Sequence, residues 1–169
     1  MSEPAAVRPA TEADLQRILD IYNDAILTTT ATWDEAPWTM ERRREWWDEH
    51  AADPTIPVLV ADRAGEVAGF SYLSWYRPKS GYRFTREDTV YVDPRFHGQG
   101  LGRALLGALM DEARRLGMHA VIASIEASNE ASIALHRSFG FELVGTEREV
   151  GFKFGRWLDS VYMEALLDR

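Results

Sequence analysis

A strand, a glycine-rich turn and a helix follow one another between residues 89 and 103, and this run constrains the fold more than any other. Residues 90–92 read Val-Tyr-Val, a β-branched and aromatic composition typical of strands. Asp93-Pro94 ends the strand, because proline cannot donate to a ladder of hydrogen bonds. After the turn, apolar residues recur with the period of a helix that buries one face: Leu101, Leu105, Leu106, Leu109, Met110, Ala113 and Leu116.

The turn contains Gly98, Gly100 and Gly102 and has the character of an anion site. Glycine lets a ligand approach the backbone, and the first N–H groups of the following helix point outward along its dipole. No Ser, Thr, Asp or Asn between positions 98 and 102 can cap those groups, so we expect an external pyrophosphate there. The alternative is an ordinary glycine-rich turn.

Two common phosphate-binding motifs do not fit this turn. A kinase-type P-loop needs a lysine after the glycines, and none is present. A dinucleotide fingerprint, counted from Gly100, needs a glycine where Leu105 stands. A dinucleotide-binding oxidoreductase is therefore only a distant alternative.

Composition excludes several other classes. With 169 residues and 46% hydrophobic content, we expect a single domain over residues 1–169 with a core from about 7 to 166. A net charge of −8 argues against a nucleic-acid partner. The chain has no cysteine, which excludes an acyl-cysteine intermediate, and its histidine spacing predicts no metal site. The sequence shows no signal peptide or membrane span, so we expect a cytoplasmic protein without a membrane partner.

Periodicity along the rest of the chain predicts an α/β (α+β) fold. Further helices are expected after a capping box at residues 11–14, over 39–50 and over 129–139. Further strands are expected over 7–10, 58–61, 67–73, 120–125, 141–145 and 157–166, and residues 75–86 are expected to be irregular. We predict helices packed on a mostly antiparallel central sheet, with parallel neighbours near the glycine-rich turn.

The segment His97-Gly98-Gln99-Gly100-Leu101-Gly102 resembles the acetyl-CoA loop of the GCN5-related N-acetyltransferases, Gln/Arg-x-x-Gly-x-Gly/Ala, with His97 in the first position. Residues 8–14, 87–92 and 151–159 resemble one subfamily, the phosphinothricin acetyltransferases and their relatives that act on methionine sulfoximine and methionine sulfone. The resemblance spans about residues 7–166. It implies the fold of that superfamily, acetyl-CoA as co-substrate, a small amine as acceptor and a homodimer.

The resemblance also implies roles for single residues. Glu87 matches the proposed general base, acting directly or through water; alternatively it is a solvated carboxylate at the end of a strand. His136 could protonate the leaving thiolate, contact CoA, or be a structural histidine. The residues implied in acetyl-CoA binding are Val90, Tyr91, Val92, Gly98, Gln99, Gly100, Leu101, Gly102, Arg103 and Asn129.

The acceptor site is expected to involve a cationic stretch. Residues 76–86 hold four Arg or Lys and no acid, which suits an acceptor bearing a carboxylate. The candidate substrate-binding residues are Trp33, Arg77, Tyr82, Arg83 and Lys153. Each of these could equally be a solvated charge or part of the core.

The function favoured by the sequence is acetyl transfer to the α-amine of a small amino-acid-like substrate. With no cysteine, the amine would attack acetyl-CoA directly within a ternary complex. The alternatives are a non-catalytic acyl-CoA-binding module and an N-acetyltransferase of another amine or of a protein N-terminus.

Overall fold

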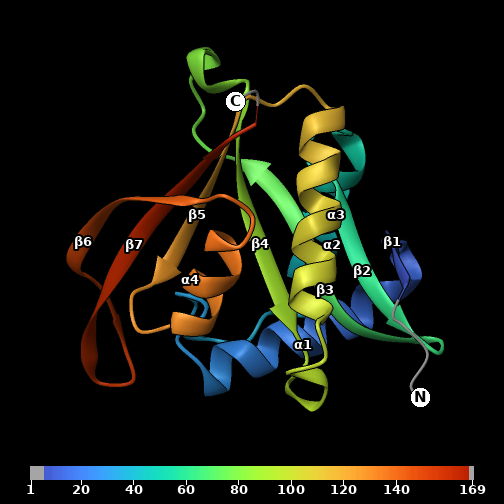
Figure 1. Ribbon diagram of the computed structural model, residues 1–169. Coiled ribbons are helices and arrows are strands. Elements are labelled where there is room, and N and C mark those ends of the chain that lie inside the picture. The colour runs from blue at the N-terminus through green and yellow to red at the C-terminus, as the bar shows by residue number, and fades with distance from the viewer. Residues whose placement is uncertain (1–5, 168–169) are drawn as a thin grey trace.

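The computed structural model describes residues 6–167, which form one seven-stranded mixed sheet flanked by helices (Figure 1). The strands are β1 (Ala6–Pro9), β2 (Val58–Arg63), β3 (Glu66–Trp75), β4 (Thr85–Val92), β5 (Ala120–Glu126), β6 (Glu142–Lys153) and β7 (Arg156–Leu166). The α-helices of this part of the chain are α1 (Leu15–Thr28), α2 (Met40–Ala52), α3 (Leu101–Arg115) and α4 (Glu130–Arg137). Short 3₁₀ turns lie at Glu12–Asp14, Ser80–Tyr82 and Pro94–Phe96.

The two strands at the centre of the sheet create the opening in which the site lies. The strand order is β1-β2-β3-β4-β5-β7-β6, and every neighbouring pair is antiparallel except β4 and β5. The parallel pair is joined only from Thr85↔Ala120 to Glu87↔Ile122. Beyond Glu87 the strands diverge, and α4 lies at the wide end of the gap (Figure 1).

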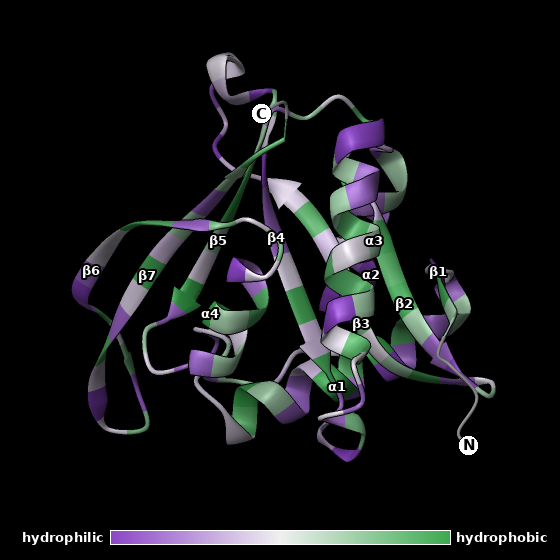
Figure 2. Cartoon of the chain, in the orientation of Figure 1, coloured by the Kyte–Doolittle hydropathy of each residue, from purple (hydrophilic) through white to green (hydrophobic). Residues whose placement is uncertain are grey.

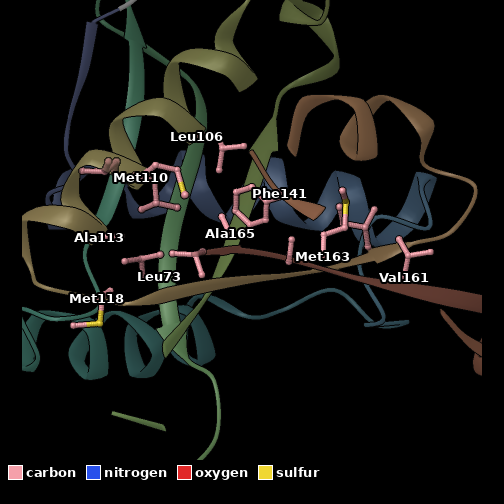
Figure 3. Packing of buried hydrophobic residues seen from close by; sticks show 14 residues of the cluster. Leu73, Leu106, Met110, Ala113, Met118, Phe141, Val161, Met163 and Ala165 are labelled. Atoms are coloured by element: carbon pink, nitrogen blue, oxygen red, sulfur yellow. The ribbon is translucent and has the colours of Figure 1, made fainter. Parts of the chain in front are cut away.

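Helices cover both faces of the sheet. On one face α3 packs its apolar side against the central strands, and the buried cluster includes Leu106 and Met110 of α3 with Leu73 and Met163 of the sheet (Figure 3). On the other face α1 places Ile18 among residues of β2 and β3. Figure 2 shows hydrophilic residues on the outward side of α3, while hydrophobic residues recur along β2, β3 and β5.

Most elements expected from the sequence are present, including the mixed, mostly antiparallel sheet and the strand, turn and helix around the three glycines. The last hairpin differs. The strand expected over 141–145 continues as β6 to Lys153, then turns through Phe154 and Gly155, both at positive φ, into β7. Most of β6 is exposed on both sides, so its sequence lacks the alternation of apolar and polar residues that marks a half-buried strand.

Candidate functional site

The glycine-rich turn leaves the N-terminus of α3 open. Gly100 is the N-cap of α3 at φ 80°, a left-handed conformation that glycine adopts at little cost, and no side chain among residues 6–167 caps the helix. Gly98 has φ 73°, and an added Cβ would meet nothing within 4 Å at either glycine. This uncapped end of a 15-residue helix fits the pyrophosphate of acetyl-CoA.

A cleft of about 350 Å³ runs along this turn, between α1, the diverging end of β4 and α4. It brings together most of the residues expected to bind acetyl-CoA: Val90, Tyr91, Val92, Gly98, Gly100, Leu101, Gly102 and Asn129. Two expected residues do not line it. Gln99 points back toward the carbonyl of Arg95, and Arg103 donates to the hydroxyl of Ser138 at 3.2 Å.

A second cavity, of about 360 Å³, lies between the diverging parts of β4 and β5 and contains Glu87; we refer to it as the acceptor cavity. The two spaces meet, because Ala31, Val90, Tyr91, Asn129 and Ser132 line both. A cofactor lying along the turn and an acceptor beside Glu87 would therefore have their reacting ends at this junction.

Glu87 is the last residue of β4 paired with β5, so the backbone fixes it at the edge of the gap. Burial raises the pKa of its carboxyl, and the neighbouring charge of Asp88 raises it further. A carboxyl group with a raised pKa, facing a cavity, suits the removal of a proton from an amine.

His136 lies on α4 and also lines the acceptor cavity, but both of its ring nitrogens are occupied. Its Nε2 lies 2.9 Å from Oδ2 of Asp88, and its Nδ1 lies 2.7 Å from the carbonyl oxygen of Ser132. Burial alone would lower the pKa of His136, but the hydrogen bond and charge of Asp88 outweigh it and raise that pKa.

Sequence reasoning missed the roles of Asp88 and Ser132 as partners of His136. Successive side chains of a strand point to opposite faces, so Asp88 points away from Glu87. Ser132 precedes His136 by four positions, a spacing that places both on one face of a helix. The alternation of side chains along a strand and the four-residue spacing on a helix are the sequence signals that could have identified these two partners.

One wall of the acceptor cavity is the loop with Thr32 and Trp33, and the β6–β7 hairpin supports it. The ring of Trp33 packs directly over Gly151, where an added Cβ would collide with it. Lys153 is only 2% exposed, and its Nζ donates to the carbonyl oxygen of Thr32 at 2.8 Å. Lys153 therefore holds the wall from behind and does not line the cavity.

The expected cationic clamp does not lie in this cavity. Arg77 stacks on Tyr76 and Tyr82 with its Cζ 4.8 and 5.5 Å from the ring centroids, and Arg83 stacks on Phe84 at 4.5 Å. Within a single chain, Arg77, Tyr82 and Arg83 do not line the cavity. The charged groups that do line it are acidic apart from His136: Asp34, Glu87, Asp88 and Glu126.

Arg43 is a buried cation next to this acidic cavity, because it stacks on Tyr22, which is part of the lining. Arg43 is 1% exposed and is stacked by Tyr22, Trp38 and Trp46, with its Cζ 4.4–4.9 Å from their centroids. Burial lowers the pKa of its guanidinium to about 10, so it still carries a positive charge at neutral pH. The cation–π contacts replace part of the hydration that the guanidinium loses.

Within residues 6–167, no three His, Asp or Glu side chains are grouped as a metal ion would require. In the same range, no helix has the length and apolar character needed to cross a membrane.

Comparisons with known proteins agree with this geometry. The model of the "Acetyltransferase (GNAT) family" matches residues 17–141. An L-methionine sulfoximine/L-methionine sulfone acetyltransferase of Pseudomonas paraeruginosa is 48% identical, over 97% of this chain and 95% of its own. A phosphinothricin acetyltransferase of Sinorhizobium meliloti, solved with acetyl-CoA, superposes with a TM-score of 0.93 at 38% identity, covering 98% of this chain and 89% of its own. A ribosomal-protein-alanine N-acetyltransferase of Brucella melitensis has a TM-score of 0.93 at 49% identity, covering 96% and 99%.

Proposed function

The chain belongs to the acetyltransferase (GNAT) family, and from that premise we propose that it acetylates the α-amine of small amino-acid-like substrates. The proposed acceptors are phosphinothricin, methionine sulfoximine and methionine sulfone, and the donor is acetyl-CoA. The observation that carries the proposal is the junction of the two cavities where β4 and β5 part, with Glu87 on the acceptor side. An amine and a thioester can approach each other there for direct transfer in a ternary complex.

The residues of the cleft would hold the donor, which supplies an activated acetyl thioester when bound. The N–H groups of Gly98, Gly100 and Gly102 at the helix N-terminus suit its phosphates. The backbone of Val90 and Val92, where β4 no longer pairs with β5, suits the thioester carbonyl and the pantetheine arm. Tyr91 and Leu101 complete the lining, and Gln99 and Arg103 stand at its margin.

Asn129 contributes to the same cleft through the end of α4. Its Oδ1 accepts from the N–H of Ser132 at 3.1 Å and caps the helix. The cap leaves the amide NH₂ group to bind the donor. Glu87 would accept the proton of the attacking amine, and His136 would be the source of the proton for the departing thiolate.

On the acceptor side, Trp33 forms a wall that Lys153 and Gly151 hold in place. Binding of the acceptor carboxylate by Arg77, Tyr82 or Arg83 stays a prediction without support from the cavity of a single chain. The variant Arg83→Ala tests this prediction. A raised KM for the amino acid with unchanged acetyl-CoA binding would support binding of the acceptor carboxylate by Arg83. An unchanged KM would remove Arg83 from the acceptor site.

Measurement of CoA-thiol release over a panel of acceptors tests the proposed function. We expect turnover with the three proposed amino acids and a much lower kcat/KM with methionine, which lacks their polar oxygens. Peptides that begin with alanine represent the second candidate, which the Brucella structure favours. Faster turnover of those peptides would replace the proposed substrate class, and donor binding without any thiol release would indicate an acyl-CoA-binding module.

We also propose that the protein is a homodimer and that it acts in the cytoplasm. The β6–β7 ribbon, residues Glu142–Leu166, supports the first proposal because it carries large exposed apolar side chains: Leu143, Val144, Val150, Phe152, Phe154 and Trp157. Exposed apolar groups gathered on one element are typical of an interface between proteins. The cytoplasmic location stays a prediction.

A further inference from the structure

Three side chains form a connected group beneath the junction of the two cavities. Asp88 comes from β4, and Ser132 and His136 come from successive turns of α4. The Asp88 and His136 side chains are 1% and 5% exposed. Ser132 is only partly buried and lines both cavities. The group therefore leads from the interior of the protein to the place where the thioester would be cleaved.

Hydrogen-bond partners fix the protons on His136. Nδ1 lies 2.7 Å from the carbonyl oxygen of Ser132, which can only accept, so Nδ1 must carry a hydrogen. Nε2 lies 2.9 Å from the carboxylate of Asp88, which accepts when it is ionised. With Asp88 ionised, both nitrogens are donors and His136 is an imidazolium. Its charge compensates that of Asp88, whose Oδ2 makes this contact and whose Oδ1 has no hydrogen-bond partner in the described chain.

The same contacts orient the hydroxyl group of Ser132. Its Oγ lies 3.4 Å from Nδ1 of His136, and because Nδ1 is a donor, Oγ can only accept from it. The hydroxyl hydrogen must then point away from His136. Since Ser132 lines both cavities, that hydrogen is available to a group at their junction.

We propose that Ser132 is the residue that protonates the departing thiolate, with His136 as its proton source and Asp88 as the positioning residue that keeps His136 charged. The inference rests on the proposed acetyl transfer. When the C–S bond breaks, its electron pair goes to sulfur, which takes the hydroxyl proton of Ser132. Nδ1 of His136 replaces that proton and gives up its hydrogen bond to the carbonyl oxygen of Ser132, which leaves a neutral imidazole with Nε2–H still bonded to Asp88. The amine proton goes to Glu87, and solvent later returns a proton through Ser132.

The test compares two acetyl donors in single-turnover experiments, which isolate the chemical step. One donor is acetyl-CoA, and the other carries selenium in place of the thioester sulfur. A selenol is a stronger acid than a thiol, so its departure needs no proton donor. We expect Ser132→Ala to lower the rate with acetyl-CoA by about 100-fold and with the selenoester by less than about threefold.

Matched variants separate this role from a structural one. Ser132→Thr keeps the hydroxyl and should restore most of the rate. Ser138→Ala removes an exposed hydroxyl near the end of the same helix and should leave the ratio of the rates with the two donors unchanged. The cap of α4 survives all of these changes, because Asn129 binds the backbone N–H of Ser132 and not its side chain.

Asp88→Asn provides a readout that does not depend on activity. An asparagine amide can donate to Nε2, so His136 should become neutral while its contacts persist. Nitrogen NMR should show both ring nitrogens protonated in the wild-type protein at neutral pH, and Nε2 unprotonated in Asp88→Asn. The variant should also lose the rate with acetyl-CoA and largely keep it with the selenoester.

The outcomes distinguish the proposed function from the proton relay, by which we mean transfer from His136 through Ser132 to the thiolate. Equal losses with both donors in Ser132→Ala, or a neutral His136 in the wild-type protein, would overturn the relay while acetyl transfer stands. If the wild-type protein releases no CoA with any acceptor, the proposed function fails and the relay fails with it.

Discussion

Two neighbouring carboxyl groups of β4, Glu87 and Asp88, have different partners although both line the same cavity. The side chain of Asp88 faces α4, and its Oδ2 lies 2.9 Å from Nε2 of His136. Glu87 faces the acceptor cavity, which no Lys or Arg of residues 6–167 lines. The Asp88 carboxyl is therefore held in a hydrogen bond to His136, while burial and the charge of Asp88 raise the pKa of Glu87.

The first prediction is that Glu87→Gln lowers kcat by about 100-fold or more at neutral pH, because glutamine cannot accept the amine proton. In the wild-type protein, Glu87 must be ionised for the reaction, because only its carboxylate form can accept the amine proton. Because its pKa is raised, kcat/KM should fall as the pH drops through a value above the ordinary glutamate pKa. The pH profile of thiol release measures both effects. An unchanged kcat in Glu87→Gln would assign the deprotonation to solvent.

The turn before α3 has two features that acetyl-CoA binding needs: a left-handed backbone conformation at Gly100 and a helix N-terminus without a side-chain cap. Gly100→Val should lose the rise in melting temperature that acetyl-CoA gives the wild-type protein, since a branched side chain disfavours φ 80° and displaces the N–H groups. Gly117→Val is the matched control, because Gly117 also has positive φ and open surroundings but follows the other end of α3. It should destabilise the fold and keep the acetyl-CoA shift. If both variants lost the acetyl-CoA shift, the loss would come from general destabilisation of the fold and not from the turn at Gly100.

The β6–β7 hairpin is the second element that shapes the site. Gly151→Ala places a methyl group against the ring of Trp33, which must move and carry the cavity wall with it. We expect KM for the amino acid to rise several-fold and the acetyl-CoA shift to remain. Gly145→Ala, on the same strand with nothing within 4 Å of the added Cβ, is the control. Equal kinetics in the two variants would mean that Trp33 does not contact the acceptor.

These two elements also show how far the sequence predicts the structure. The turn and α3 follow from local signals, the three glycines and a helical period of apolar residues, so their positions could be predicted. The second half of β6 could not, because it is exposed and its pairing with β7 is interrupted between Glu147 and Gly151. The contact of Asp88 with His136 joins residues 48 positions apart, and only the packing of α4 over the strand gap brings them together.

Within residues 6–167, the helices leave the β6–β7 end of the sheet uncovered. The sheet ends in β6, and the β6–β7 ribbon extends beyond the helices (Figure 1). An edge strand offers unpaired backbone groups to another chain, and this one also offers apolar side chains. The same ribbon carries Gly151 and Lys153, so the surface that would meet a second copy is continuous with the support of the acceptor cavity.

The last prediction is that this ribbon forms the interface of a homodimer. Phe152 and Trp157 form an edge-to-face pair across the hairpin, yet they are 48% and 62% exposed in the single chain. Burial of such aromatic groups contributes strongly to association. Light scattering should therefore give twice the protomer mass of 19.2 kDa, and Phe152→Ser with Trp157→Ser should give the monomer. Leu27→Ser, at an apolar side chain of α1 that is 58% exposed, should leave the dimer intact. A wild-type particle of protomer mass at micromolar concentration would contradict the prediction, and a dimer that survives the double substitution would place the interface elsewhere.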